Sequence, residues 1–191
     1  ISNLNFTTYN CQYTTGTNGM VGKYITFDSS PNLVNGGSVN LSNGLTIEML
    51  LKPGYQFNTT NLLQRADGAF SIRIEFAKLT FTTSYKTSTG TSVEDKFEIE
   101  LDGIGRKSYG YYVDNNWHHL VFKVDGTTGS KQIWVDGQLA AGFSKTITPG
   151  SFQNSGSTTF YLNHSISYVK YYGSIDELAI YDKAIPDALL H

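Results

Sequence analysis

The chain of 191 residues has one cysteine, Cys11, and no apolar run near the roughly 18 residues that a membrane-spanning helix needs. A single cysteine excludes an internal disulfide and a zinc site built from several thiolates. Charged residues make up 16% of the chain, below the usual value of about a quarter, and the formal net charge is -2. Because no block of like charges occurs, the electrostatic footprint of a nucleic-acid-binding protein is missing.

Residues that favour strands are abundant. Val, Ile, Thr and the aromatic residues number 69, whereas the strong helix formers Ala, Leu, Met, Glu, Gln, Lys and Arg number 52. This balance predicts an all-β protein. The length suits one domain with a single core, so we expect residues 1–191 to form one domain. A surface rich in Ser, Thr, Asn and Tyr is typical of exported β modules.

Apolar and polar residues alternate along much of the chain. Every second residue from Leu45 to Leu51 is apolar, and Pro53-Gly54 ends this run. Leu50, on the second face, indicates that this face is partly covered too. The same alternation recurs in 70–76, 79–81, 97–101, 120–124 and 133–135, and a last strand is expected over 174–181.

Turn signals separate these segments: Ala66-Asp67-Gly68, Asn115-Asn116, Asp125-Gly126 and Asp136-Gly137. Pro186 and Asp187 open at most one helical turn after the last strand. About a dozen short strands at this spacing predict two packed antiparallel sheets, with a barrel as the alternative.

Three ordered segments resemble the laminin G-like jelly-roll domains of the concanavalin A-like lectin/glucanase superfamily. They are LTIEMLLKP (45–53), WHHLVFKVDGTTGSKQIWVDGQL (117–139) and GSIDELAIYDKAI (173–185). The first matches a strand in which the family usually has Trp where this chain has Leu50. The resemblance implies a two-sheet jelly-roll sandwich of a kind that usually binds carbohydrate or another extracellular ligand.

Three carboxylates, Glu98, Glu100 and Asp102, are spaced to project from one face of a strand. The superfamily includes retaining β-glucanases that use Glu-x-Asp-x-Glu on such a strand, which makes a glycosidase the enzymatic alternative. Here the order is Glu-x-Glu-x-Asp, so the shorter side chain falls at the position of the acid. We therefore expect a solvated strand face balanced by Lys96, Arg106 or Lys107.

Exposed aromatic side chains are the residues expected to bind a saccharide, because a flat ring stacks on the apolar face of a sugar. The candidates are Tyr85, Tyr109, Tyr111, Trp134, Tyr168 and Tyr171. Trp134 is favoured because Ile133 and Val135 should occupy the core-facing side of its strand. The neighbours His118 and His119 should face opposite sides of a strand, so the pair cannot chelate one ion, and we expect a structural role for one of them.

The resemblance also implies a structural calcium site, because domains of this superfamily often bind an ion with a carboxylate of the closing strand. Asp176 matches that position, and Asp28 is its expected neighbour. The leading hypothesis is a non-catalytic carbohydrate-binding (lectin-like) or adhesion module that acts outside the cell or on a cell or virion surface, as part of a longer chain. A domain that only makes protein contacts is the remaining alternative.

Overall fold

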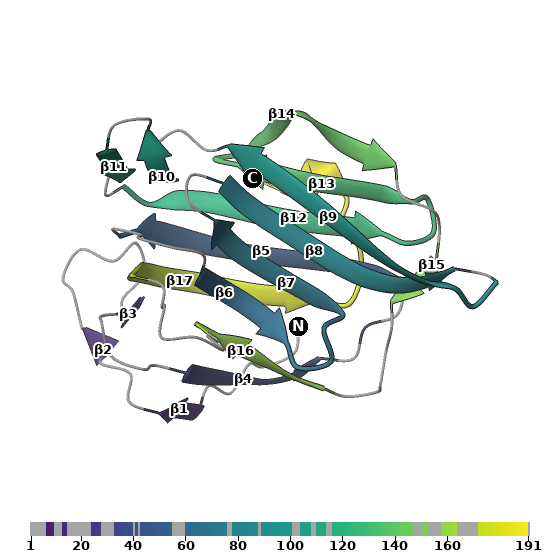
Figure 1. The fold of residues 1–191 in the computed structure, drawn as a ribbon, viewed down its shortest axis with the longest axis horizontal. Coiled ribbons are helices and arrows are strands. Elements are labelled where there is room, and N and C mark those ends of the chain that lie inside the picture. Colours follow the sequence, from purple (N-terminus) through teal and green to yellow (C-terminus); the bar gives the residue numbers. More distant parts are fainter. Residues whose placement is uncertain are drawn as a thin grey trace.

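The structure is a computed structural model. It describes residues 7–9, 13–14, 24–27, 33–39, 41, 43–54, 60–75, 78–87, 89–100, 104–107, 110–113, 116–146, 150–152, 158–163 and 172–190. Two antiparallel sheets stack face to face, so that one lies in front of the other in Figure 1. The expected sandwich is confirmed, and we call the face of each sheet that turns away from the other sheet its outer face.

The first sheet has eight strands. In spatial order they are β1 (Thr7–Tyr9), β4 (Leu33–Val39), β16 (Thr158–Leu162), β6 (Thr60–Arg65), β7 (Phe70–Glu75), β8 (Lys78–Thr87) and β15 (Gly150–Phe152), while β9 (Ser92–Glu100) also pairs with β8. The turn predicted at Ala66-Asp67-Gly68 joins β6 to β7.

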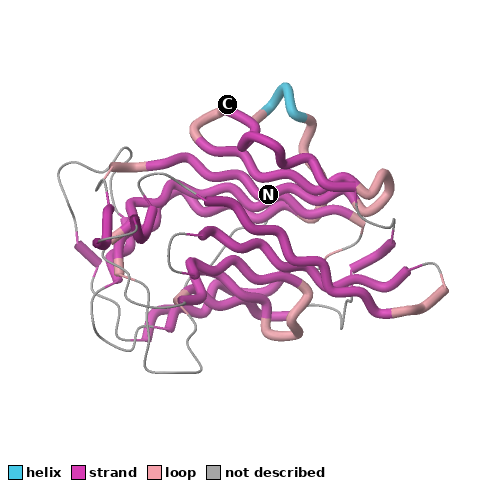
Figure 2. Tube along the Cα trace, turned by 45° about the horizontal axis from the view of Figure 1, so that its top comes forward, coloured by secondary structure: helices cyan, strands magenta, loops and turns pink. Residues whose placement is uncertain are grey.

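The second sheet has seven strands. In spatial order they are β14 (Gln138–Thr146), β13 (Ser130–Val135), β12 (His118–Asp125), β5 (Gly44–Pro53), β17 (Gly173–Tyr181), β3 (Tyr24–Phe27) and β2 (Tyr13–Thr14). A separate hairpin consists of β10 (Ile104–Lys107) and β11 (Gly110–Val113). The one helical turn among the described residues is η1 (Asp187–Leu189), which lies outside the strands in Figure 2.

The core follows the alternation in the sequence. On β5, Leu45, Ile47, Met49 and Leu51 are all 0% exposed, because this side of the strand faces the other sheet.

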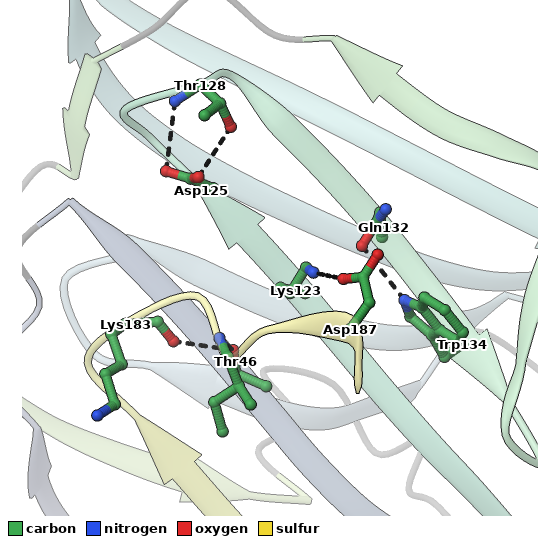
Figure 3. Close-up of polar contacts among 9 residues, drawn as sticks. Thr46, Lys123, Asp125, Thr128, Gln132, Trp134, Lys183 and Asp187 are labelled. Atoms are coloured by element: carbon green, nitrogen blue, oxygen red, sulfur yellow. Dashed lines mark hydrogen bonds and ion pairs between the residues drawn. The ribbon is translucent and has the colours of Figure 1, made fainter. Parts of the chain in front are cut away.

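The expected turn at Asp125-Gly126 joins β12 to β13. There the Asp125 carboxylate accepts hydrogen bonds from the backbone N–H of Thr127 (2.9 Å) and the hydroxyl of Thr128 (2.8 Å, Figure 3).

The C-terminal segment 182–190 lies across the outer face of the seven-stranded sheet. The Thr46 hydroxyl donates a hydrogen bond to the Lys183 carbonyl (2.8 Å) and accepts one from the Ile185 N–H (2.9 Å). Lys123 forms an ion pair with Asp187 (Figure 3). Gly44 permits this crossing, since a Cβ at that position would lie 2.5 Å from the backbone nitrogen of Ala184.

Within the described part of the chain, no helix has the length and apolar character that crossing a membrane requires.

Candidate functional site

A row of polar side chains crosses the outer face of the eight-stranded sheet. Their neighbours along each strand, such as Ile72 and Phe81, are buried in the core, so the alternating polar residues must face outward. The strand register aligns the members of this first row from β6 to β9: Asn61 with Arg73, Arg73 with Thr80, and Thr80 with Glu98. Residues that are far apart in the sequence thereby form one continuous polar surface.

A second row runs beside the first. Aligned across β16, β6, β7, β8 and β9 are Tyr161, Gln64, Ser71, Thr82 and Lys96. We call the two together the polar rows. Their amide, hydroxyl, guanidinium and carboxylate groups supply both donors and acceptors, which is the chemistry that recognises hydroxyl groups.

Several polar atoms in these rows are buried and have no hydrogen-bond partner among the described residues. They include Oε1 of Gln64, Nε of Arg73 and Oγ1 of Thr80. Thr80 is 0% exposed, although its side chain belongs to the outer face. Because buried polar groups in folded proteins are nearly always hydrogen-bonded, these three atoms carry hydrogen-bonding capacity that the described residues do not use.

Glu98, at the end of the first row, is held by two lysines. Its carboxylate lies 2.5 Å from Nζ of Lys96 and 3.8 Å from Nζ of Lys78. The hydrogen bond from Lys96 is the main reason that the pKa of Glu98 is lowered, and the positive charges of Lys96 and Lys78 lower it further. Lys96 therefore balances this carboxylate as the sequence predicted, and Glu98 is ionised at neutral pH.

The other two candidate catalytic carboxylates are less fully described. Glu100 lies in β9 opposite Lys78, but its side chain is outside the described part of the structure, as is the whole of Asp102. The balancing partners Arg106 and Lys107 lie in β10, and their side chains are not described either.

Trp134 lies on the seven-stranded sheet and points away from the core, as predicted. Its neighbour Ile133 is 0% exposed, whereas Trp134 is half-buried and donates a hydrogen bond from Nε1 to Oε1 of Gln132 at 3.3 Å (Figure 3). Trp134 and Glu98 thus lie on opposite outer faces of the sandwich. Of the candidates whose side chains are described, Trp134 and Glu98 therefore do not belong to one site.

The remaining aromatic candidates are placed only in part. Tyr85 lies in β8 and Tyr111 in β11, without described side chains, while Tyr109, Tyr168 and Tyr171 lie outside the described residues. Their role in saccharide stacking stays a prediction.

The expected calcium site is also only partly described. Oδ1 of Asp176 accepts a hydrogen bond from the Glu177 N–H at 2.9 Å, and Oδ2 is buried without a hydrogen-bond partner. Asp28 lies outside the described residues. Within the described ranges, no three or more His, Cys, Asp or Glu residues are grouped so that they could hold a metal ion. The free oxygen of Asp176 suits a hard cation, but one carboxylate is far from a full ligand set.

The sequence analysis missed Gln64, Arg73 and Thr80. Alternation could have placed Arg73 and Thr80 on the outer side of their strands, since each stands between core residues. Their alignment into a row depends on which strands pair and in what register, which a single sequence does not show.

Comparison with known proteins identifies the family. A family model described as the concanavalin A-like lectin/glucanases superfamily matches residues 22–189, which is most of the chain. The chain belongs to this superfamily, as the three sequence motifs predicted. No curated protein sequence matches the chain.

Solved structures share the fold at low sequence identity. The binding domain of Paraclostridial Mosquitocidal Protein 1 has a TM-score of 0.73 and 16% identity, over 98% of this chain and 46% of that one. Domain 4 of AbnA, a GH43 extracellular arabinanase from Geobacillus stearothermophilus solved with arabinotriose, has a TM-score of 0.67 and 19% identity, over 99% and 88%.

The binding domain of Botulinum neurotoxin DC in complex with SialylT has a TM-score of 0.69 and 15% identity, over 97% of this chain and 44% of that one. The present chain thus spans a little under half the length of the toxin binding domains that it matches.

Proposed function

We propose that this chain is a non-catalytic saccharide-binding module whose ligand lies across the polar rows. The observation that carries this proposal is the set of buried, unpartnered polar atoms on Gln64, Arg73 and Thr80. Sugar hydroxyls both donate and accept hydrogen bonds, so a saccharide that lies along the polar rows offers partners for the Gln64 oxygen, the Arg73 nitrogen and the Thr80 hydroxyl. The solved structure of the arabinanase domain with arabinotriose supports the same class of ligand for this fold.

The state of Glu98 supports binding rather than hydrolysis. A glycosidase needs one carboxyl kept protonated as the acid, and its partner free to attack or to activate water. Glu98 is ionised, and Lys96 and Lys78 both contact its carboxylate oxygens. In this arrangement Glu98 can accept a hydrogen bond from a sugar hydroxyl, but it is poorly suited to attack an anomeric carbon.

The module is proposed to act in a secreted or surface-bound protein. The similar structures are a domain of an extracellular enzyme and binding domains of toxins. A role limited to protein contacts is less well supported, because the large apolar side chains exposed in the described part of the chain are just Leu139 and Leu189.

A glycan array followed by calorimetry with the strongest ligand tests the proposal. Arg73→Ala and Gln64→Ala should each weaken saccharide binding by about tenfold, the effect of losing one or two hydrogen bonds. Gln138→Ala is the matched control, because Gln138 is exposed on the other sheet. The saccharide affinity of Gln138→Ala should equal that of the wild type.

A reducing-sugar assay on β-glucans, agarans and xyloglucan covers the enzymatic alternative. New reducing ends that disappear in Glu98→Gln would replace the binding proposal with hydrolysis. No binding on the glycan array together with no new reducing ends in the assay would favour a role in protein contacts.

A further inference from the structure

A separate cavity of about 520 Å³ lies on the outer face of the seven-stranded sheet, on the opposite side of the sandwich from the polar rows. Side chains from β5, β12 and β17 line it together with the turn between β13 and β14. The lining residues that matter chemically are Glu48, Leu50, His119, Asp136, Glu177 and Tyr181.

Two local irregularities of the sheet build the walls of this cavity. Asp136 and Gly137 both have positive φ values, 51° and 74°, which is the geometry of the tight type I′ turn. On the other side, β17 has a bulge between Asp176 and Ala179, where Glu177 has a φ of 49°. Leu50 and Ala179 form an apolar part of the lining between these two walls.

The cavity is acidic, and its carboxylates are held in position. Oε1 of Glu48 lies 2.7 Å from the ring Nε2 of His119, and Oδ1 of Asp136 accepts a hydrogen bond from the backbone N–H of His119 at 2.8 Å. Oδ2 of Asp136 lies 2.9 Å from Nδ1 of His118. Glu177 adds a third carboxylate on the exposed bulge. No Lys or Arg belongs to the described lining, and the contacts described for the carboxylates of Glu48 and Asp136 are made with the two histidines.

We infer that this cavity binds an alkylammonium group. The positive nitrogen would lie among the carboxylates of Glu48 and Glu177, where charge-assisted hydrogen bonds are strong. The aliphatic stem would contact Leu50 and Ala179, and the ring of Tyr181 offers a further cation–π surface. A solvated acidic surface would explain the carboxylates alone, but it would not explain why the apolar side chains of Leu50 and Ala179 line the same open pocket as a carboxylate that a histidine holds in place.

The source that carries both the ammonium and the aliphatic stem is the side chain of a lysine in a partner protein; the amino group of an amino sugar, which lacks the stem, is the alternative that the second experiment distinguishes. Both are compatible with the proposed saccharide-binding function, and the inference does not depend on it because the two sites lie on opposite faces.

The first experiment uses the wild-type chain and two small probes of similar shape, n-butylammonium and n-butanol. Binding is followed by NMR through the ring signals of His119 and Tyr181. We expect the cation to bind at least about tenfold more tightly than the neutral alcohol, because only the cation gains from the carboxylates. Equal affinities, or no shift of either ring with the cation, would overturn the inference.

The second experiment identifies the source. Nα-acetyl-lysine amide and glucosamine are titrated separately, each against its uncharged counterpart, Nα,Nε-diacetyl-lysine amide and N-acetylglucosamine. A preference for the lysine derivative supports a protein side chain as the natural ligand, and a preference for glucosamine supports an amino sugar. An uncharged counterpart that binds as well as its amine contradicts the assignment of the cavity.

Matched variants then locate the binding site. Glu48→Gln should weaken n-butylammonium binding by about tenfold, since the amide is isosteric but neutral. Glu177→Gln should also weaken it, and this exposed position serves where Glu48→Gln disturbs the sheet. The control is Glu94→Gln, an exposed residue of β9 on the other sheet. Affinities for both cavity variants equal to that of Glu94→Gln would overturn the inference.

Discussion

The side chain of Lys131 crosses the interior of the sandwich, and its Nζ donates a hydrogen bond to the carbonyl oxygen of Phe81 on the opposite sheet at 3.0 Å. The same ammonium donates to the Asp95 carbonyl (2.9 Å) and the Thr83 hydroxyl (3.1 Å), and it lies 4.5 Å from the centroid of the Phe81 ring. Lys131 is 0% exposed. All three donors of a buried ammonium are therefore used in joining β13 to β8 and β9.

This contact predicts that Lys131→Ala destabilises the fold strongly. The substitution leaves a cavity and three buried acceptors without their donor, which should lower the free energy of unfolding by about 3 kcal/mol in urea denaturation. Lys131→Met keeps most of the stem and should fall between the wild type and the alanine variant. Lys183→Ala, at an exposed lysine, is the control. A Lys131→Met variant as stable as the wild type would show that the ammonium contributes nothing net, as happens for some buried ions.

Thr80 and Thr83 make a matched pair on one strand. The Thr80 hydroxyl is buried without a partner, whereas the Thr83 hydroxyl accepts a hydrogen bond from Lys131. Thr80→Val removes an unsatisfied group at constant shape, so the melting temperature should stay unchanged or rise while saccharide affinity falls. Thr83→Val should cost about 1–2 kcal/mol of stability and leave saccharide affinity unchanged. The reverse pattern would contradict the assignment of Thr80 to the binding face.

Local signals in the sequence predicted much of this fold. The alternation around Leu45–Leu51 gave β5 its correct buried face, and Asp136-Gly137 marked a real hairpin turn, because both features depend on neighbouring residues alone. The role of Gly44 was not predictable, since the segment that crosses it lies about 140 residues later in the chain. The row from Asn61 to Glu98 was not predictable for the same reason, since it forms only when β6, β7, β8 and β9 pair.

The lowered pKa of Glu98 predicts a pH-dependent contribution to stability. A carboxyl whose pKa is lower in the folded state stabilises that state above its ordinary pKa, near 4.5, and loses this contribution as the pH falls through the folded value. The wild type should thus be slightly more stable than Glu98→Gln at neutral pH, and the difference should shrink below about pH 4.5. The effect is small because the pair is partly exposed.

Urea denaturation at neutral and acidic pH measures this difference. In parallel, Lys96→Met should move the pKa of Glu98 back toward its ordinary value, which carboxyl NMR titration reports directly. A Glu98 pKa that does not respond to Lys96→Met would mean that Lys96 is not its partner in solution.

The carboxylate of Asp176 is the expected calcium ligand. One oxygen of its carboxylate is occupied by the Glu177 N–H, while the other is buried without a partner, an arrangement that a hard cation would relieve. We propose that calcium binds here and stabilises the folded chain, because a ligand that binds only the native state adds about 2.7 kcal/mol at a concentration of 100 times its Kd. The melting temperature should rise with calcium in the wild type and in Asp182→Asn, an exposed control, but not in Asp176→Asn. If a chelator and excess calcium give the wild type the same melting temperature, Asp176 holds no ion and its buried oxygen has another role.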